Sequence, residues 1–418
     1  MKPSKIQLKK IIENPLTLLK WLAFACLIGA VVGAVSTAFY YGFVLASRLW
    51  TKFSWLLYLL PAGGLAIVLL YRVCGMEKDR GTNFVLVAVR ENADLPLRTA
   101  PLVFAATLLT HLLGGSSGRE GAALQIGGSI SSTIGRLMHL DDKDSRIITM
   151  CGMSAAFGAL FGTPIAAAVF SMELISVGIM YYAAIVPCVL SAVAGVYVAQ
   201  LFSVAPTVFT VSQVPETSLL LTGQVLAMGV LCALVSVLFC RAMHLAPKLY
   251  QRFLPNPLWR AAAGGCIIIL LTLLTGSRDY NGAGGATIAA AIGGSAAPAA
   301  FLLKIAFTAL TLGAGFKGGE IVPAFFTGAT FGCWAAPLLG LPAPYGAALG
   351  LISVFCGVTN CPMTSLFLAM EIFGGVSMPM FAVCCAVSYM LSGYYSLYSE
   401  QKIVYGKLRP EFINRKAK

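Results

Sequence analysis

The chain has 418 residues, of which 58% are apolar and 11% are charged. Soluble chains carry about 25% charged residues, so this composition excludes an ordinary water-exposed surface and indicates a protein embedded in lipid. The formal net charge of +13 is concentrated near the two ends, and the middle of the chain lacks the basic, aromatic-interleaved stretches that nucleic-acid binding would require.

Five apolar runs are long enough to span a bilayer as helices. They cover residues 19–47, 54–71, 181–204, 218–243 and 257–275. The first run is too long for a signal peptide. Shorter runs broken by Gly or Pro, which indicate helices that end inside the membrane near a buried site, cover residues 101–117, 122–137, 146–161, 164–178, 300–315, 321–338, 343–357, 362–376 and 379–395.

The chain also repeats itself. Residues 164–174 match residues 362–372, with Pro, Met and Glu at the same spacing 198 positions apart. Gly118-Arg-Glu-Gly121 similarly parallels the segment from Gly319 to Pro323. We therefore expect an all-α polytopic membrane protein with an inverted repeat. The expected divisions are a cytoplasmic N-terminal segment, two repeats and a short basic cytoplasmic tail without a regulatory domain: 1–17, 18–210, 211–398 and 399–418. Basic ends predict cytoplasmic termini, and we expect the bacterial inner membrane.

The run Gly114 to Gly121 (GGSSGREG) ends one apolar segment and opens the next. Glycine allows a sharp turn and a close backbone approach, and a helix N-terminus favours an anion. Arg119 and Glu120 are costly in hydrocarbon, so both are functional candidates. Adjacent residues do not face each other on a helix, so we expect Arg119 to hold the loop elsewhere. A carboxylate at this place can occupy the anion site and leave it on protonation.

Three features resemble the CLC anion channel and transporter family: GSSGREG, the stretch from Lys304 to Pro323, and the paired Pro…Met-Glu helices. The resemblance extends from about Leu18 to Tyr398. It implies a homodimer with one pore per subunit and Glu120 as the gating glutamate. It implies no enzyme activity and no cofactor, and the sequence predicts no metal site.

Three departures resemble the fluoride-exporting branch of that family. The family motif G-S-G-I-P reads Gly81-Thr-Asn-Phe-Val85, Glu320 stands in a usually apolar segment, and Leu174 replaces the second of two inner glutamates. The aromatic stretch ending at Tyr398 is also similar to that branch. The implied function is fluoride export in exchange for protons. One feature fits poorly, because Val322 stands where members of that branch often have Thr.

The expected site follows from these motifs. Glu120 and Glu320 are the expected gating or proton-accepting acids, although Glu320 could instead pair with Lys317. Glu173 and Glu371 occupy equivalent repeat positions and are expected to be structural, capping neighbouring helices. Phe84 and Tyr398 could present positive ring edges to an anion or simply pack in the core. The expected anion-binding residues are Gly81, Thr82, Asn83, Phe84, Gly118, Arg119, Gly121, Ile321, Val322 and Tyr398.

Two other functions are weighed against this one. The same fold could form a chloride channel or a chloride/proton exchanger. An intramembrane serine protease would use the Gly115-Ser-Ser-Gly118 run with His111 or His244 as base, but the repeat has no place in that fold. The expected partners are fluoride or chloride, protons, membrane lipid and a second copy of the chain, with no nucleic acid.

Overall fold

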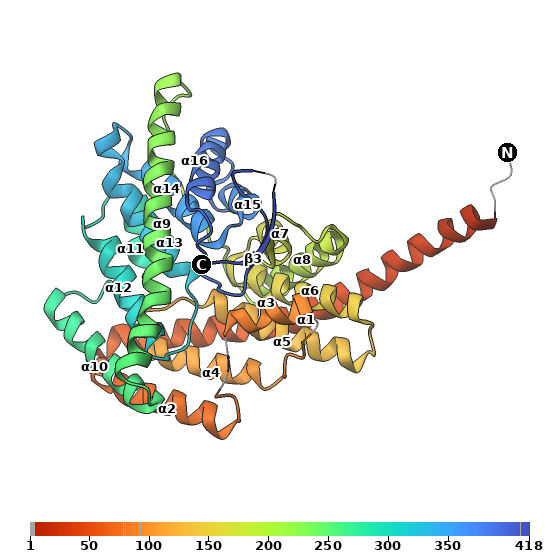
Figure 1. Cartoon of the computed structure of the whole chain (residues 1–418), viewed down its shortest axis with the longest axis horizontal. Helices are drawn as coiled ribbons and strands as arrows, with labels where there is room; N and C mark the ends of the chain where they lie inside the picture. The colour runs from red at the N-terminus through yellow and green to blue at the C-terminus, as the bar shows by residue number, and fades with distance from the viewer. Residues whose placement is uncertain (1–4, 78, 80, 92, 410) are drawn as a thin grey trace.

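The computed structural model describes residues 5–77, 79, 81–91, 93–409 and 411–418. It is mainly helical (Figure 1). The α-helices are α1 (Lys5–Lys52), α2 (Leu60–Val73), α3 (Thr82–Glu91), α4 (Thr99–Leu112), α5 (Glu120–Leu137), α6 (Asp142–Phe161), α7 (Pro164–Glu173), α8 (Ile185–Leu201), α9 (Leu219–Phe253), α10 (Pro257–Thr275), α11 (Gly285–Ile292), α12 (Ala300–Gly313), α13 (Ile321–Ala335), α14 (Ala343–Thr359), α15 (Pro362–Phe373) and α16 (Met378–Leu391). Short 3₁₀ turns are η1 (Ser54–Leu59), η2 (Tyr182–Ala184) and η3 (Pro337–Leu339).

Five helical segments in this described part are long and apolar enough to cross a membrane: Pro15–Lys52, Ser54–Val73, Tyr182–Leu201, Leu219–Phe253 and Pro257–Thr275. They coincide with the five long runs predicted from the sequence. In Figure 1 α1 runs along the long axis of the molecule, while α9 crosses that direction. Side chains along these helices are exposed on one side, as Leu234 and Leu274 are, which suits helices that face lipid.

The shorter apolar runs form helices that end inside the structure. Pro164 and Pro362 each occupy the first position of a helix, where the missing N–H costs nothing. Asp141 caps α6 and Ser218 caps α9 by accepting a backbone N–H. The bounds of these helices match the segments predicted from the sequence closely, whereas α3 and α11 were not predicted.

Glycines allow two helix pairs to approach closely. A Cβ added at Gly127 of α5 would lie 2.2 Å from the carbonyl oxygen of Gly152 on α6. A Cβ added at Gly328 of α13 would lie 2.3 Å from the carbonyl oxygen of Gly350 on α14. Small residues at such crossings let membrane helices pack backbone to backbone. The two tight pairs hold α5 and α13, the helices whose first turns form the site below.

The C-terminal tail contains a small sheet in addition to the helices. Strand β1 (Ser176–Val177) pairs in parallel with β2 (Lys402–Tyr405), and β2 pairs antiparallel with β3 (Phe412–Lys416). In the register, Ser176 lies opposite Lys402, and Lys402 lies opposite Lys416. The tail predicted only as a short basic segment therefore folds onto the chain just after α7.

Candidate anion and proton site

The loops before α5 and α13 meet back to back. Gly118 N donates to the carbonyl of Gly319 at 2.6 Å, and Gly319 N donates to the carbonyl of Gly118 at 2.7 Å. These two bonds form an isolated antiparallel bridge. The first turns of α5 and α13, and the acids beside them, are therefore fixed relative to each other.

Glu120 begins α5 and is fully buried. Its Oε2 accepts from the backbone N–H of Arg119 at 2.9 Å, and its Oε1 lies 3.4 Å from Arg119 Nε. The expectation that Arg119 would hold the loop only elsewhere is wrong. Arg119 lies before the first helical turn, where the spacing rule for side chains within a helix does not apply. Arg119 also donates to the carbonyl of Leu160 at 3.4 Å.

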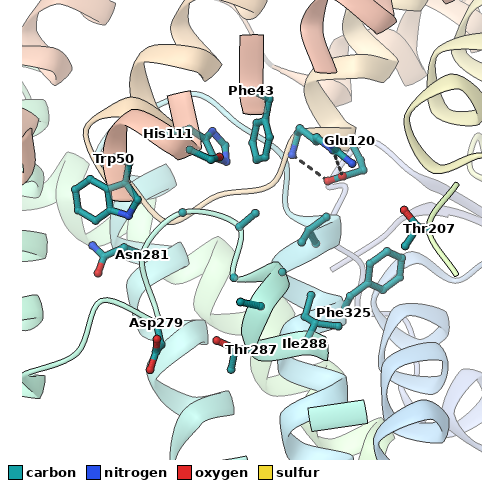
Figure 2. Close-up of a pocket in the computed structure, with 18 of the residues that line it drawn as sticks. Phe43, Trp50, His111, Glu120, Thr207, Asp279, Asn281, Thr287, Ile288 and Phe325 are labelled. Carbon is teal, nitrogen blue, oxygen red and sulfur yellow. Dashed lines mark hydrogen bonds and ion pairs between the residues drawn. The ribbon is translucent and has the colours of Figure 1, made fainter. Parts of the chain in front are cut away.

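A cavity of about 500 Å³ opens next to Glu120, and we call it the outer cavity. Figure 2 shows Glu120 with Phe43, His111 and Trp50 along one wall, and Asn281 and Thr287 facing them. The Arg119 guanidinium also lies over the Phe43 ring, 5.1 Å from its centre. Arg119 and Val322, two of the predicted site residues, line this cavity with Glu120.

Lys304 holds the far wall of the outer cavity. It is fully buried, and its Nζ donates to the carbonyls of Tyr280 at 3.1 Å and Gly282 at 2.7 Å. The ammonium also lies 5.0 Å from the centre of the Phe326 ring. Lys304 thus fixes the loop before α11, as a buried partner and not as a reacting group.

A second cavity of about 450 Å³ lies on the side of the C-terminal tail. We call it the inner cavity. Its lining includes predicted site residues from three separate parts of the chain: Gly81, Thr82, Asn83, Glu320 and Tyr398. Phe84 lines neither cavity and packs partly buried against the hydrophobic core, which favours the packing interpretation for that residue.

Glu320 precedes α13 and carries a buried Oε2 atom that has no hydrogen-bond partner among the described residues. A Cβ added at Gly121 would lie 3.4 Å from this oxygen, so Glu320 faces the first turn of α5. The alternative pairing with Lys317 does not form, because Lys317 Nζ lies 2.8 Å from Asp79 Oδ2. Ile321 follows Glu320 at the start of α13 and is fully buried.

Tyr398 is 1% exposed, and its hydroxyl has no partner within the described structure. Thr82 Oγ1 donates to the carbonyl of Gly121 at 3.3 Å, and Gln125 Nε2 donates to the same carbonyl at 3.1 Å. Asn83 Oδ1 accepts from the N–H of Glu400 at 3.0 Å. The inner cavity thus has a free hydroxyl and a free carboxylate oxygen at its wall, which are groups able to exchange a proton or contact a small anion.

Glu173 and Glu371 cap helices of the opposite half, as expected. Glu173 accepts from the N–H groups of Met363 and Thr364 and from the Thr364 hydroxyl, at 3.0, 2.8 and 2.6 Å. Glu371 accepts from the N–H groups of Ile165 and Ala166, both at 2.9 Å. Both carboxylates stabilise free N–H groups at a helix start.

The geometry that the alternative protease function requires does not form. His111 Nε2 lies 2.8 Å from the carbonyl oxygen of Ser117, while the Ser117 hydroxyl has no partner among the described residues. His244 Nε2 contacts the carbonyl of Ser396 at 2.7 Å. A serine nucleophile needs a base at its hydroxyl, and neither histidine provides one.

Sequence reasoning missed three residues near the two cavities. Asp79 pairs with Lys317, Gln125 holds the start of α5, and Arg278 lines the outer cavity with its guanidinium 3.8 Å from the centre of the Trp50 ring. Of these three residues, only Asp79 could have been identified from the sequence, because it is an acid just before the Gly81 motif.

Comparison with known proteins shows which family has this fold and site. Residues 62–393 match the family model described as voltage gated chloride channel. The chain belongs to this CLC family. A chloride/fluoride channel protein of Pseudomonas syringae pv. tomato is 35% identical over 395 residues, which cover 93% of this chain and 87% of that protein. The voltage-gated ClC-type chloride channel ClcB of Escherichia coli O157:H7 is 24% identical over 357 residues, covering 81% and 84%.

Solved CLC structures have the same fold. A CLC-type fluoride/proton antiporter superposes with a TM-score of 0.89 at 33% identity, over 92% of this chain and 98% of that chain. A slow cyanobacterial Cl⁻/H⁺ antiporter superposes with a TM-score of 0.75 at 17% identity, over 89% and 94%. This chain is thus an integral membrane protein of a channel and transporter family, with the inverted-repeat CLC fold of broken helices.

Proposed function

We propose that this CLC protein exports fluoride in exchange for protons. The observation that supports it most is the arrangement of three acids. Glu120 begins α5 and lines the outer cavity, while Glu320 precedes α13, faces the first turn of α5 and lines the inner cavity. Glu173 is committed to capping α15. Proton exchange at the anion site therefore involves Glu120 and Glu320, without a third acid at the end of α7.

In this proposal Glu120 is the gate. Its carboxylate occupies the anion-favouring start of α5 and is held by Arg119. A proton arriving from the outer cavity removes the negative charge, weakens the contact with Arg119 and frees the place for fluoride. Glu320 and Tyr398 then face the anion and the proton from the inner cavity. The fluoride and proton pass in opposite directions through one site.

The test uses purified protein in liposomes with a fluoride gradient, and follows proton uptake and fluoride efflux together. We expect proton uptake that tracks fluoride efflux. Glu120→Gln should block exchange or leave fluoride flux without proton movement. Glu216→Gln is the matched control, because Glu216 is exposed in the loop between α8 and α9. Fast anion flux without proton movement in the unmodified protein would reject the antiporter proposal.

The second candidate function is a chloride channel or chloride/proton exchanger, favoured by the 24% identity to ClcB. Parallel measurements of fluoride and chloride flux separate the two candidates. A chloride flux equal to or greater than the fluoride flux would favour the second.

We also propose a homodimer with one pore per subunit, in a bacterial inner membrane with both termini in the cytoplasm. Exposed apolar side chains on α8, among them Val193, Tyr197 and Leu201, support a protein or lipid partner on that side. The division into repeats at 18–210 and 211–398 is supported by the reciprocal capping between α7 and α15. No enzymatic reaction is part of the proposal.

A further inference from the structure

A third cavity of about 260 Å³ lies beside the inner cavity. Its walls come from the C-terminal ends of α2 and α9, the start of α10, and the segment 315–317. It shares Asp79 and Lys317 with the inner cavity, so it lies on the same side of the molecule as the C-terminal tail. We call it the α2–α10 cavity.

The charges on its wall do not balance. Arg72 Nε pairs with Glu77 Oε1 at 2.9 Å. Lys317 Nζ pairs with Asp79 Oδ2 at 2.8 Å. The third cation among the described lining residues is Arg260, near the start of α10. Its Nε is buried and has no hydrogen-bond partner within the described residues. Among the described residues of its lining, the α2–α10 cavity therefore holds one positive charge, on Arg260, that no acid neutralises.

Tyr71 adds a second unsatisfied donor. The residue lines the α2–α10 cavity and is 5% exposed, and its hydroxyl has no partner in the described structure. The Lys317 ammonium lies 4.3 Å from the centre of its ring, so the ring is held in place. Buried hydroxyls and guanidinium N–H groups normally have a partner, and leaving both unpaired is unfavourable. A bound acceptor would satisfy both.

We propose that the α2–α10 cavity binds a phosphate group through Arg260 and Tyr71. A guanidinium can donate two parallel hydrogen bonds to phosphate oxygens, and a tyrosine hydroxyl can donate another. The volume exceeds what a single halide ion needs. Basic pockets between membrane helices on the cytoplasmic side bind lipid headgroups.

Two sources can supply the phosphate group. Phe253 and Trp259 both precede Arg260 in the chain and are 72% and 69% exposed, as aromatic residues at a membrane interface are. They would place an anionic phospholipid headgroup next to the cavity. Free inorganic phosphate offers the same oxygens without acyl chains, so the experiment must separate these sources.

The test measures thermal unfolding of the full-length protein in a neutral detergent. Phosphatidylglycerol, phosphatidylcholine, inorganic phosphate and sodium fluoride are added separately. We expect phosphatidylglycerol, inorganic phosphate or both to raise the midpoint, while phosphatidylcholine and fluoride do not. A shift with phosphatidylglycerol alone identifies a lipid headgroup, a shift with inorganic phosphate alone identifies free phosphate, and a shift with both identifies a general phosphate site.

Variants decide whether the shift arises in the α2–α10 cavity. Arg260→Gln should weaken the apparent affinity roughly tenfold or more, and Tyr71→Phe by a smaller factor. Arg252→Gln is the matched control. Arg252 is exposed at the C-terminal end of α9, which borders the cavity, but it does not line the cavity. The proposal is overturned if neither phosphate source shifts the midpoint, if Arg260→Gln keeps the full shift, if Arg252→Gln loses as much, or if fluoride produces the same Arg260-dependent shift.

Discussion

Gly118 and Gly319 exchange both of their backbone hydrogen bonds, at 2.6 and 2.7 Å, across the junction of the two halves of the chain. Each glycine lies just before a short helix that starts inside the structure. Because the bond pair joins the two loops directly, the acid after each glycine is held at a fixed place. Glu120 thus lines the outer cavity while Glu320 lines the inner one.

Replacing Gly319 with Ala should therefore disrupt the site. A Cβ at Gly319 would lie 2.6 Å from the backbone nitrogen of Gly121 and 3.2 Å from that of Glu120. Backbone atoms cannot rotate away as a side chain can, so we expect a loss of about 1–3 kcal/mol in stability and loss of fluoride flux. Thermal unfolding measures the loss of stability, and liposome flux measures the loss of transport. Gly223→Ala is the control, because its added Cβ would meet no atom within 4 Å apart from the neighbouring backbone of its own helix, and it should behave like the unmodified protein.

The sequence was sufficient to predict much of this arrangement. Pro164 and Pro362 marked helix starts, and the spacing of the following Met and Glu residues revealed the repeat. The Glu120 position was predictable because a glycine run opens a helix at a charged residue within an apolar region. Membrane helices are the elements that sequence shows best, since each must satisfy its own backbone.

Other parts depended on contacts between distant segments. Asp79 and Lys317 are far apart in the chain, and no local pattern links them. Arg119 contacts Glu120 because both lie where a loop becomes a helix, which a helix spacing rule does not describe. The strand β2 forms because the tail meets residues 176–177 in parallel. Such pairings arise from the folded chain as a whole.

Glu173 provides a test of which acids take part in proton exchange. Its carboxylate accepts three hydrogen bonds from Met363 and Thr364. Glu173→Gln keeps the shape but removes the charge and one acceptor oxygen, so we expect about 1–3 kcal/mol of destabilisation. Thermal unfolding should show it, while the ratio of protons to fluoride in liposomes stays unchanged. A lost or altered ratio in a well-folded Glu173→Gln protein would assign a proton-transfer role to this residue.

Val322 provides a test of anion selectivity. It lines the outer cavity with Glu120 and has nearly the shape of threonine. Val322→Thr adds a hydroxyl donor, and a small, strongly hydrated anion gains more from such a donor than a larger one does. We expect the fluoride-to-chloride flux ratio to rise several-fold, as one added hydrogen bond of about 1 kcal/mol would give. Val230→Thr, on the exposed side of α9, should leave the ratio unchanged, and an unchanged ratio in Val322→Thr would remove this position from selectivity.

Lys407 attaches the C-terminal tail to the helices. Its ammonium donates to Asn360 Oδ1, to the carbonyl of Tyr389 at 2.9 Å and to Ser392 Oγ at 3.1 Å. Lys407→Met would leave Asn360 Oδ1, a buried acceptor, without its Lys407 donor, at a cost of about 1–3 kcal/mol. We expect a lower midpoint of thermal unfolding at neutral pH. Lys402→Met is the control, since Lys402 lies on the nearby strand β2 and its ammonium makes no hydrogen bond to a described residue.

Lys407 also predicts the direction in which the stability of the folded protein changes with pH. Burial lowers the pKa of Lys407 to about 8, whereas the pKa of an unfolded lysine is about 10.4. The folded protein therefore releases this proton at lower pH than the unfolded chain does. Its stability rises with pH between these two values, because the unfolded state binds more protons there. Lys407→Met lacks this contribution, so the difference in unfolding midpoint between the two proteins should widen from pH 8 to pH 10. A difference that narrows over that range would contradict the assignment of a buried, partly desolvated amine at Lys407.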